Sequence, residues 1–203
     1  MEISTRRTLH SRLSTLCSQL SYDMSRLRAL PDPFVATVKK LPGYAELMTN
    51  YTHCPTCEKC ERSFVYLTPR EQVSAERLGL RTYGEGAAAR LNRVGCKCPF
   101  YDPGTYQCSA YLDRPLICNL FPLDMLEHEK DGRHWWMLFG ACDEVRLGRL
   151  KSKIPAFKRL AREIDRRMPL DLKRSLVADA AGAVAEPVFY RYPIYWLLPV
   201  SGL

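Results

Sequence analysis

Eight cysteines between positions 54 and 142 are the residues of this 203-residue chain that could do the most chemistry. Three of them form a tight group and five follow at wider spacing: Cys54, Cys57 and Cys60, then Cys96, Cys98, Cys108, Cys118 and Cys142. Thiolates are soft ligands that suit zinc ions and iron–sulfur clusters. The sequence therefore predicts that these eight residues supply the ligands of a metal centre. The ninth cysteine, Cys17, lies alone in a predicted helix, where a thiol is usually a small apolar filler.

The spacing of the first group helps to choose the metal. Its C-x2-C-x2-C pattern is similar to the iron–sulfur run C-x2-C-x2-C-x3-C-P, in which a short loop can present sulfur to three separate irons. Phe64 stands where the next cysteine of that run would be, so a fourth ligand must come from elsewhere, and Cys98 is followed by Pro99 as a remote ligand can be. We predict a 4Fe-4S cluster whose ligands come from six residues: Cys54, Cys57, Cys60, Cys98, Cys108 and Cys118.

Zinc is the alternative, since the same three thiolates could hold a zinc ion and eight thiols suffice for two four-thiolate sites. Disulfides are a third option. They need an oxidising compartment, and the first twenty residues contain no continuous apolar segment that would direct export. We therefore expect a cytoplasmic protein, in which clustered thiols indicate metal more often than disulfides.

Several motifs around these cysteines resemble the YkgJ-type cysteine-cluster family, which is described as a zinc- or iron-chelating domain. The resemblance covers about Cys54 to Cys142 and consists of Cys54-x2-Cys57-x2-Cys60, Thr68-Pro69-Arg70-Glu71, Cys98-Pro99-Phe100-x-Asp102, Cys108, Arg114-Pro115-x2-Cys118 and Phe121-Pro122. The family often has two adjacent cysteines at the end of the first group, whereas Cys60 here is followed by Glu61. The resemblance implies metal binding and does not assign a reaction.

The elements that must position the cysteines are mainly helical. Leucine and methionine at spacings of three and four predict an amphipathic helix from about Thr8 to Ala29. A break at Pro42-Gly43, a short strand over 64–67 and a capping box at Thr68-Pro69-Arg70-Glu71 are expected next. Residues 96–119 should be irregular and organised by metal, and 135–139 a buried strand or core segment. We expect a basic helix over 145–168 interrupted near Pro155, a helix over 170–183, and an aromatic tail that packs back on the domain.

The predicted fold class is mostly α with short β strands, in a single domain over 1–203 built around an irregular cysteine-rich metal-binding centre. Within it we distinguish a cysteine core (54–142), an N-terminal helical segment (1–50) and the basic helices with the aromatic tail (145–203). No run of eighteen apolar residues exists, which predicts no membrane span.

The net charge of +8 is concentrated in the C-terminal third. Eleven Lys and Arg side chains lie between Arg146 and Arg174, against three carboxylates. A protein partner is therefore expected at the basic helices or the aromatic tail, and nucleic acid is the alternative partner. The sequence contains no nucleophile elbow, P-loop, zinc-protease motif or glycine-rich fingerprint for S-adenosylmethionine, so it assigns no enzyme activity.

Overall fold

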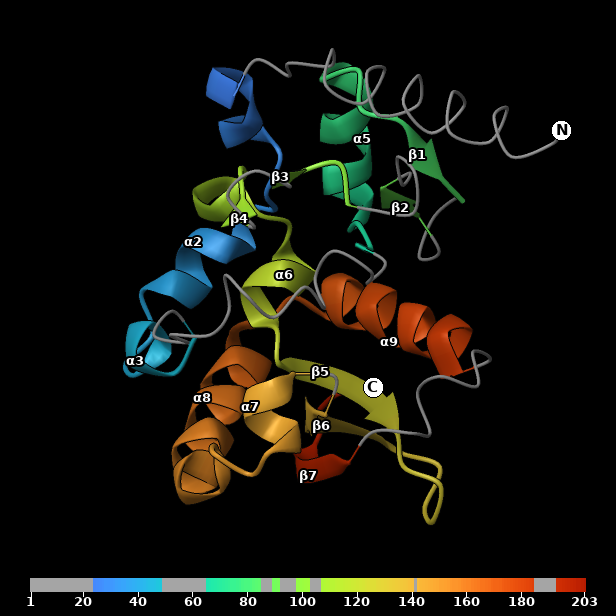
Figure 1. Cartoon of the computed structure of the whole chain (residues 1–203). Helices are drawn as coiled ribbons and strands as arrows, with labels where there is room; N and C mark the ends of the chain where they lie inside the picture. Colours follow the sequence, from blue (N-terminus) through green and yellow to red (C-terminus); the bar gives the residue numbers. More distant parts are fainter. Residues whose placement is uncertain are drawn as a thin grey trace, which may run out of the picture.

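A computed structural model of the chain describes residues 24–48, 65–84, 89–91, 98–102, 107–140, 142–184 and 193–203 (Figure 1). Most of the helix predicted from Thr8 lies outside these residues, and its last part, Met24–Ala29, is a 3-10 helix (η1). Helices α2 (Phe34–Lys39) and α3 (Tyr44–Met48) follow. The predicted break between them is confirmed, because Gly43 adopts a left-handed φ of 80° that few side chains tolerate.

Helix α5 (Pro69–Arg77) begins as the sequence predicts. The Thr68 side chain accepts a hydrogen bond from the Glu71 N–H, the Glu71 carboxylate accepts one from the Thr68 N–H, and Pro69 occupies the first turn. The strand expected before this helix is reduced to a single β-bridge between Tyr66 and Arg90. Local capping therefore fixes α5, while the preceding segment pairs only briefly.

Two small antiparallel hairpins lie near α5. Strand β1 (Thr82–Tyr83) pairs with β2 (Arg90–Leu91), and β3 (Tyr101–Asp102) pairs with β4 (Gln107–Cys108). A 3-10 turn, η4 (Tyr111–Asp113), and the short helix α6 (Leu116–Leu120) follow. The segment that we expected to be irregular thus contains regular hydrogen-bonded elements.

A three-stranded antiparallel sheet forms the other part of the fold. Its order is β5 (Leu123–Glu127), β6 (His134–Phe139) and β7 (Ile194–Pro199), with β6 in the middle. The buried strand predicted over 135–139 is confirmed. Strand β7 comes from the aromatic tail, so this part of the tail packs back on the sheet as predicted.

Three helical pieces replace the basic helix predicted over 145–168. They are α7 (Asp143–Arg146), η5 (Lys151–Lys153) and α8 (Ile154–Arg167). The predicted interruption near Pro155 is confirmed, because α8 begins at Ile154 and Pro155 lies in its first turn, where the missing N–H costs nothing. Helix α9 (Leu170–Val184) follows as predicted. Helix α8 contacts β7 and α9 contacts β5.

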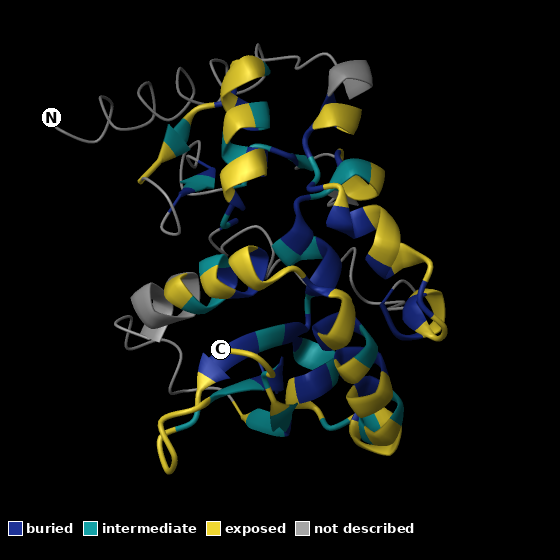
Figure 2. Ribbon diagram, turned by 180° about the vertical axis from the view of Figure 1, so that it is seen from behind, coloured by how far each residue is buried: buried dark blue, intermediate teal, exposed yellow. Residues whose placement is uncertain are grey.

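Buried side chains form two hydrophobic clusters (Figure 2). The larger core joins α2, α3, α8 and the sheet around Trp136 and Phe157, which are fully buried. The smaller core lies by α5 and the two hairpins and includes Leu67, Leu80 and Phe100. Helix α6 lies between the two groups of elements in Figure 1 and contributes to both cores.

Helices predominate over strands in the described residues, in agreement with the predicted mostly α fold class. The single-domain organisation and its subdivision remain predictions. In the described part of the chain, each helix is too short or too polar to cross a bilayer.

Candidate metal-binding site

The structure places four of the eight predicted cysteine ligands: Cys98, Cys108, Cys118 and Cys142. The other four lie outside the described residues: Cys54, Cys57, Cys60 and Cys96. The geometry of the site therefore comes from its second half.

The β3–β4 hairpin and the turn before it carry Cys98 and Cys108. The Tyr101 N–H donates to the carbonyl of Cys98 at 3.0 Å, and Tyr101 is the strand partner of Cys108. The hairpin is closed further by Ser109, whose N–H and hydroxyl donate to the Phe100 carbonyl at 2.8 and 3.0 Å. The Cys98-Pro99-Phe100 turn and Cys108 are thus held by one small antiparallel unit.

Helix α6 carries the third thiol, Cys118. The Asn119 side-chain amide donates to the carbonyls of Arg114 and Pro115 at 2.6 and 3.0 Å, which fastens the start of the helix. The Tyr44 hydroxyl donates to the Asn119 carbonyl at 2.9 Å and fastens its end to α3. Cys118 is therefore presented by a short helix with several side-chain attachments.

These three thiols share one hydrophobic surface. Cys98, Cys108 and Cys118 are half-buried and all pack against the smaller core. Cys142 lies elsewhere: it is 6% exposed and belongs to the larger core with Val145. The structure brings three of the predicted ligands onto one cluster of residues and places the fourth described cysteine in the other cluster.

The donor set suits a soft metal, because three thiol groups at one apolar surface are the ligands that zinc and iron–sulfur clusters take. Within the described ranges, no three His, Cys, Asp or Glu side chains are close enough to hold a metal ion by themselves. The membership of each predicted cysteine in a ligand set stays a prediction.

Burial and charge act in opposite directions on Cys108. Burial raises the pKa of its thiol, while the Ala110 N–H and the positive charge of Arg114 act to lower it. Burial prevails, so the metal-free thiol stays protonated near neutral pH. A metal ion would release that proton on binding.

Arg114 is the cation whose charge acts on the Cys108 thiol. Its guanidinium carbon lies 4.0 Å from the centre of the Tyr111 ring, a cation–π contact. Its Nε is buried and has no hydrogen-bond partner in the described part of the chain. Arg114 therefore sets a positive charge beside the β4–α6 segment.

A buried carboxylate beside α6 is the feature that sequence reasoning missed. Glu71 is fully buried, and its Oε1 accepts hydrogen bonds from the N–H of Asp32 at 2.9 Å and of Leu116 at 2.6 Å. Its Oε2 accepts from the Thr68 N–H at 3.0 Å. The capping-box motif predicts only the bond to Thr68, because that bond is local, and nothing in the sequence signals the two distant partners.

The environment of Glu71 favours the neutral acid. Burial raises its pKa to about 7, the three backbone N–H groups lower it in part, and the nearby Asp32 carboxylate raises it again. Asp32 is itself held, by the Phe34 N–H at 2.8 Å and the Thr68 hydroxyl at 3.2 Å. Two buried carboxylates thus share one hydrogen-bonded group.

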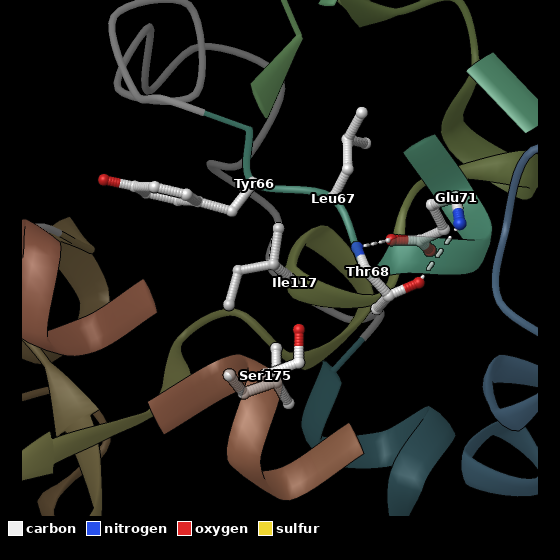
Figure 3. A pocket seen from close by; sticks show the side chains of 7 residues that line it. Tyr66, Leu67, Thr68, Glu71, Ile117 and Ser175 are labelled. Atoms are coloured by element: carbon white, nitrogen blue, oxygen red, sulfur yellow. Dashed lines mark hydrogen bonds between the residues drawn. The ribbon is translucent and has the colours of Figure 1, made fainter. Parts of the chain in front are cut away.

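A small pocket opens next to Glu71 (Figure 3). Tyr66 and Thr68 line it on the α5 side, and Ile117 and Ser175 come from α6 and α9. It has room for about one water molecule. The pocket is too small for an organic substrate.

Residues 53–137 match the model of the family named CxxCxxCC, whose description is "putative zinc- or iron-chelating domain". No curated protein and no solved structure matches the chain. The matched residues contain seven of the eight predicted ligands and exclude Cys142. Over residues 53–137, less than half of the chain, the sequence is similar to this family, which is the YkgJ-type cysteine-cluster family.

Proposed function

We propose that this protein holds a metal centre through the thiolates of its central cysteines, and that the centre is an iron–sulfur cluster of the 4Fe-4S type. The observation that supports the proposal is that Cys98, Cys108 and Cys118, all within the residues that match the family model, pack against the same hydrophobic cluster. An apolar surrounding is suited to a cluster, since solvent exposure and hydrogen bonds to sulfur tune its potential.

The choice of iron–sulfur over zinc rests on ligand spacing. A C-x2-C-x2-C loop at Cys54, Cys57 and Cys60 supplies three thiolates from seven residues. The second half, Cys98-x9-Cys108-x9-Cys118, lacks the closely spaced pairs of a structural zinc site. A cluster with three ligands from the loop and one from the second half is compatible with both the C-x2-C-x2-C spacing and the wide spacing of the later cysteines. A reducing cytoplasm would keep these thiols available.

Purification without oxygen, followed by elemental analysis and a visible spectrum, tests the metal. The proposal expects a brown protein that contains iron and acid-labile sulfide. A colourless protein with stoichiometric zinc would reject the cluster and favour the alternative function, a structural zinc module that presents a partner-binding surface.

A specific observation supports that partner-binding role. Five exposed cations along η5 and α8 have no carboxylate within ion-pair distance among the described residues: Lys151, Lys153, Lys158, Arg159 and Arg162. Four other arginines of this region form ion pairs: Arg146, Arg149, Arg166 and Arg167. Lys158, Arg159 and Arg162 lie on one side of α8, opposite its buried residues. We propose that this basic face docks an acidic protein surface.

The affinity of this basic face for an acidic polymer can be measured by fluorescence anisotropy with labelled poly-glutamate at low salt. Changing Lys158, Arg159 and Arg162 to Ser should weaken binding several-fold. A control that changes the exposed Arg70, Arg77 and Arg81 to Ser removes the same charge elsewhere. Equal losses in both variants would show only a net-charge effect and reject a defined docking face. Stronger binding of an oligonucleotide than of poly-glutamate would favour nucleic acid instead.

A further inference from the structure

Glu71 connects three segments that are far apart in the sequence. Its carboxylate accepts the N–H groups of Asp32, Thr68 and Leu116, and 39 and 45 residues separate Glu71 from the first and the last of these. The side chain is fully buried, so losing these partners would leave polar groups without access to bulk solvent. Figure 3 shows the reciprocal bonds between Thr68 and Glu71 at the edge of the small pocket.

The bond to Leu116 has a particular structural role. Leu116 is the first residue of α6, and the first N–H groups of a helix have no partner within it. Pro115 precedes the helix and supplies no side-chain cap. In most helices a residue next to the helix start accepts the hydrogen bonds of the first N–H groups. Here Glu71, which is distant in the sequence, accepts the hydrogen bond of the Leu116 N–H. Because α6 has only five residues, its position depends on such outside contacts.

Helix α6 carries Cys118, two residues after Leu116. Leu116 and Leu120 are fixed in the larger core, while Ile117 and Cys118 pack against the smaller one. A rotation or shift at the start of α6 would move the Cys118 thiol relative to Cys98 and Cys108. The attachment to Glu71 opposes that movement.

We propose that Glu71 is a positioning residue for the metal site: by holding the first N–H of α6, it keeps the Cys118 thiol in register with the thiols of the β3–β4 hairpin. This inference rests on the proposed metal-binding function. Outer groups that orient ligands are commonly worth about 10- to 100-fold in metal affinity. Glu71 differs from the usual case because it acts on the ligand's helix and not on the ligand atom.

Cobalt(II) titration of the metal-free protein provides the test, because thiolate-to-cobalt bands report both affinity and coordination geometry. In Glu71→Asp the carboxylate is retracted by one methylene and can no longer reach Leu116, although its charge is kept. The inference expects a cobalt affinity at least about 10-fold weaker, with altered coordination bands, in protein that remains folded by circular dichroism. Glu71→Gln, which keeps the length of the side chain but offers one acceptor oxygen to three N–H groups, gives a second comparison if Glu71→Asp does not fold.

Thr68→Ala is the matched control. It removes the hydroxyl that caps α5 and contacts Asp32, but it leaves the Glu71 carboxylate on Leu116. The control should lose stability and keep wild-type cobalt affinity. Wild-type affinity and bands in both Glu71 variants, or an equal loss in Thr68→Ala, would overturn the inference. If wild-type protein shows no thiolate bands with cobalt, it is the proposed metal function that fails.

Discussion

The carboxylate of Glu71 accepts a hydrogen bond of 2.6 Å from the backbone N–H of Leu116, across 45 residues of sequence. The bond joins the capped start of α5 to the start of the helix that carries Cys118. It also places an ionisable group in a site that is closed to bulk solvent. The consequences can be measured in the stability of the protein as well as in its metal affinity.

The stability of the metal-free protein should fall as the pH rises from about 5 to 8. Burial raises the pKa of Glu71 from 4.5 to about 7, so the folded protein binds a proton that the unfolded chain releases between these values. The bound proton contributes about 3 kcal/mol to the free energy of unfolding. This contribution is fully present below pH 4.5 and is lost as the pH rises through 7. Asp124, whose pKa burial raises to about 6, acts in the same direction.

Urea unfolding at several pH values checks this dependence. Glu71→Gln should remove most of the slope between pH 5 and 8 and leave the smaller part due to Asp124. An unchanged slope in this variant would show that Glu71 does not titrate in the predicted range.

Replacing Lys173 with Met should destabilise the protein by about 3 to 5 kcal/mol, because it leaves a buried carboxylate without its cation. Lys173 Nζ lies 3.1 Å from Asp165, and both side chains are less than a tenth exposed. Burial alone would raise the pKa of Asp165, but hydrogen bonds from Ser201, Trp136 and Lys173 outweigh burial and lower it. The cost of Lys173→Met should therefore shrink in acid, where Asp165 can take up a proton.

Arg166→Met is the matched control for the buried pair. Arg166 contacts Glu163 at 2.7 Å, but its side chain is 66% exposed, and exposed pairs contribute at most about 1 kcal/mol. Thermal or urea unfolding of both variants makes the comparison. Equal costs would contradict the burial of the Asp165–Lys173 pair.

Gly140→Ala should disrupt the junction between β6 and β7. A Cβ at Gly140 would clash with the carbonyl oxygen of Pro193 and lie 2.8 Å from its nitrogen, and this backbone leads into β7. We expect a loss of about 3 kcal/mol, the upper end for overpacking, with a change in the near-UV signal of Trp196.

Gly132→Ala, at a turn, is the control for the stability loss expected in Gly140→Ala. Gly132 has a left-handed φ of 64° but no atom within 4 Å of its added Cβ, so only the backbone conformation opposes the substitution, at about 1 kcal/mol. If Gly132→Ala costs as much as Gly140→Ala, steric contact with Pro193 is not what limits the β6–β7 junction.

Local signals in the sequence predicted the local structure well. The capping box at Thr68 and Glu71 predicted the start of α5, and Pro42-Gly43 predicted the break between α2 and α3. Pro155 predicted an interruption of the basic helix, and α8 begins at Ile154 with Pro155 in its first turn, because proline is tolerated at a helix start and not in a helix interior.

Long-range contacts could not be predicted in the same way. The bond between Glu71 and Leu116 and the placement of Cys142 in the larger core depend on how distant segments pack, and neither is encoded in spacing. The sequence identified the cysteines as a set from their number and spacing. The structure places Cys142 in the larger core, whereas Cys98, Cys108 and Cys118 pack against the smaller one.

The central claim is tested most directly by measuring metal and acid-labile sulfide content. The measurement compares the wild type with two cysteine variants, all purified without oxygen. We predict iron and sulfide in the wild type, loss of both when Cys98, Cys108 and Cys118 are changed together to Ser, and wild-type content in Cys17→Ser. Retention of the full iron and sulfide content by the triple variant, or a wild-type protein without iron and sulfide, would contradict the account.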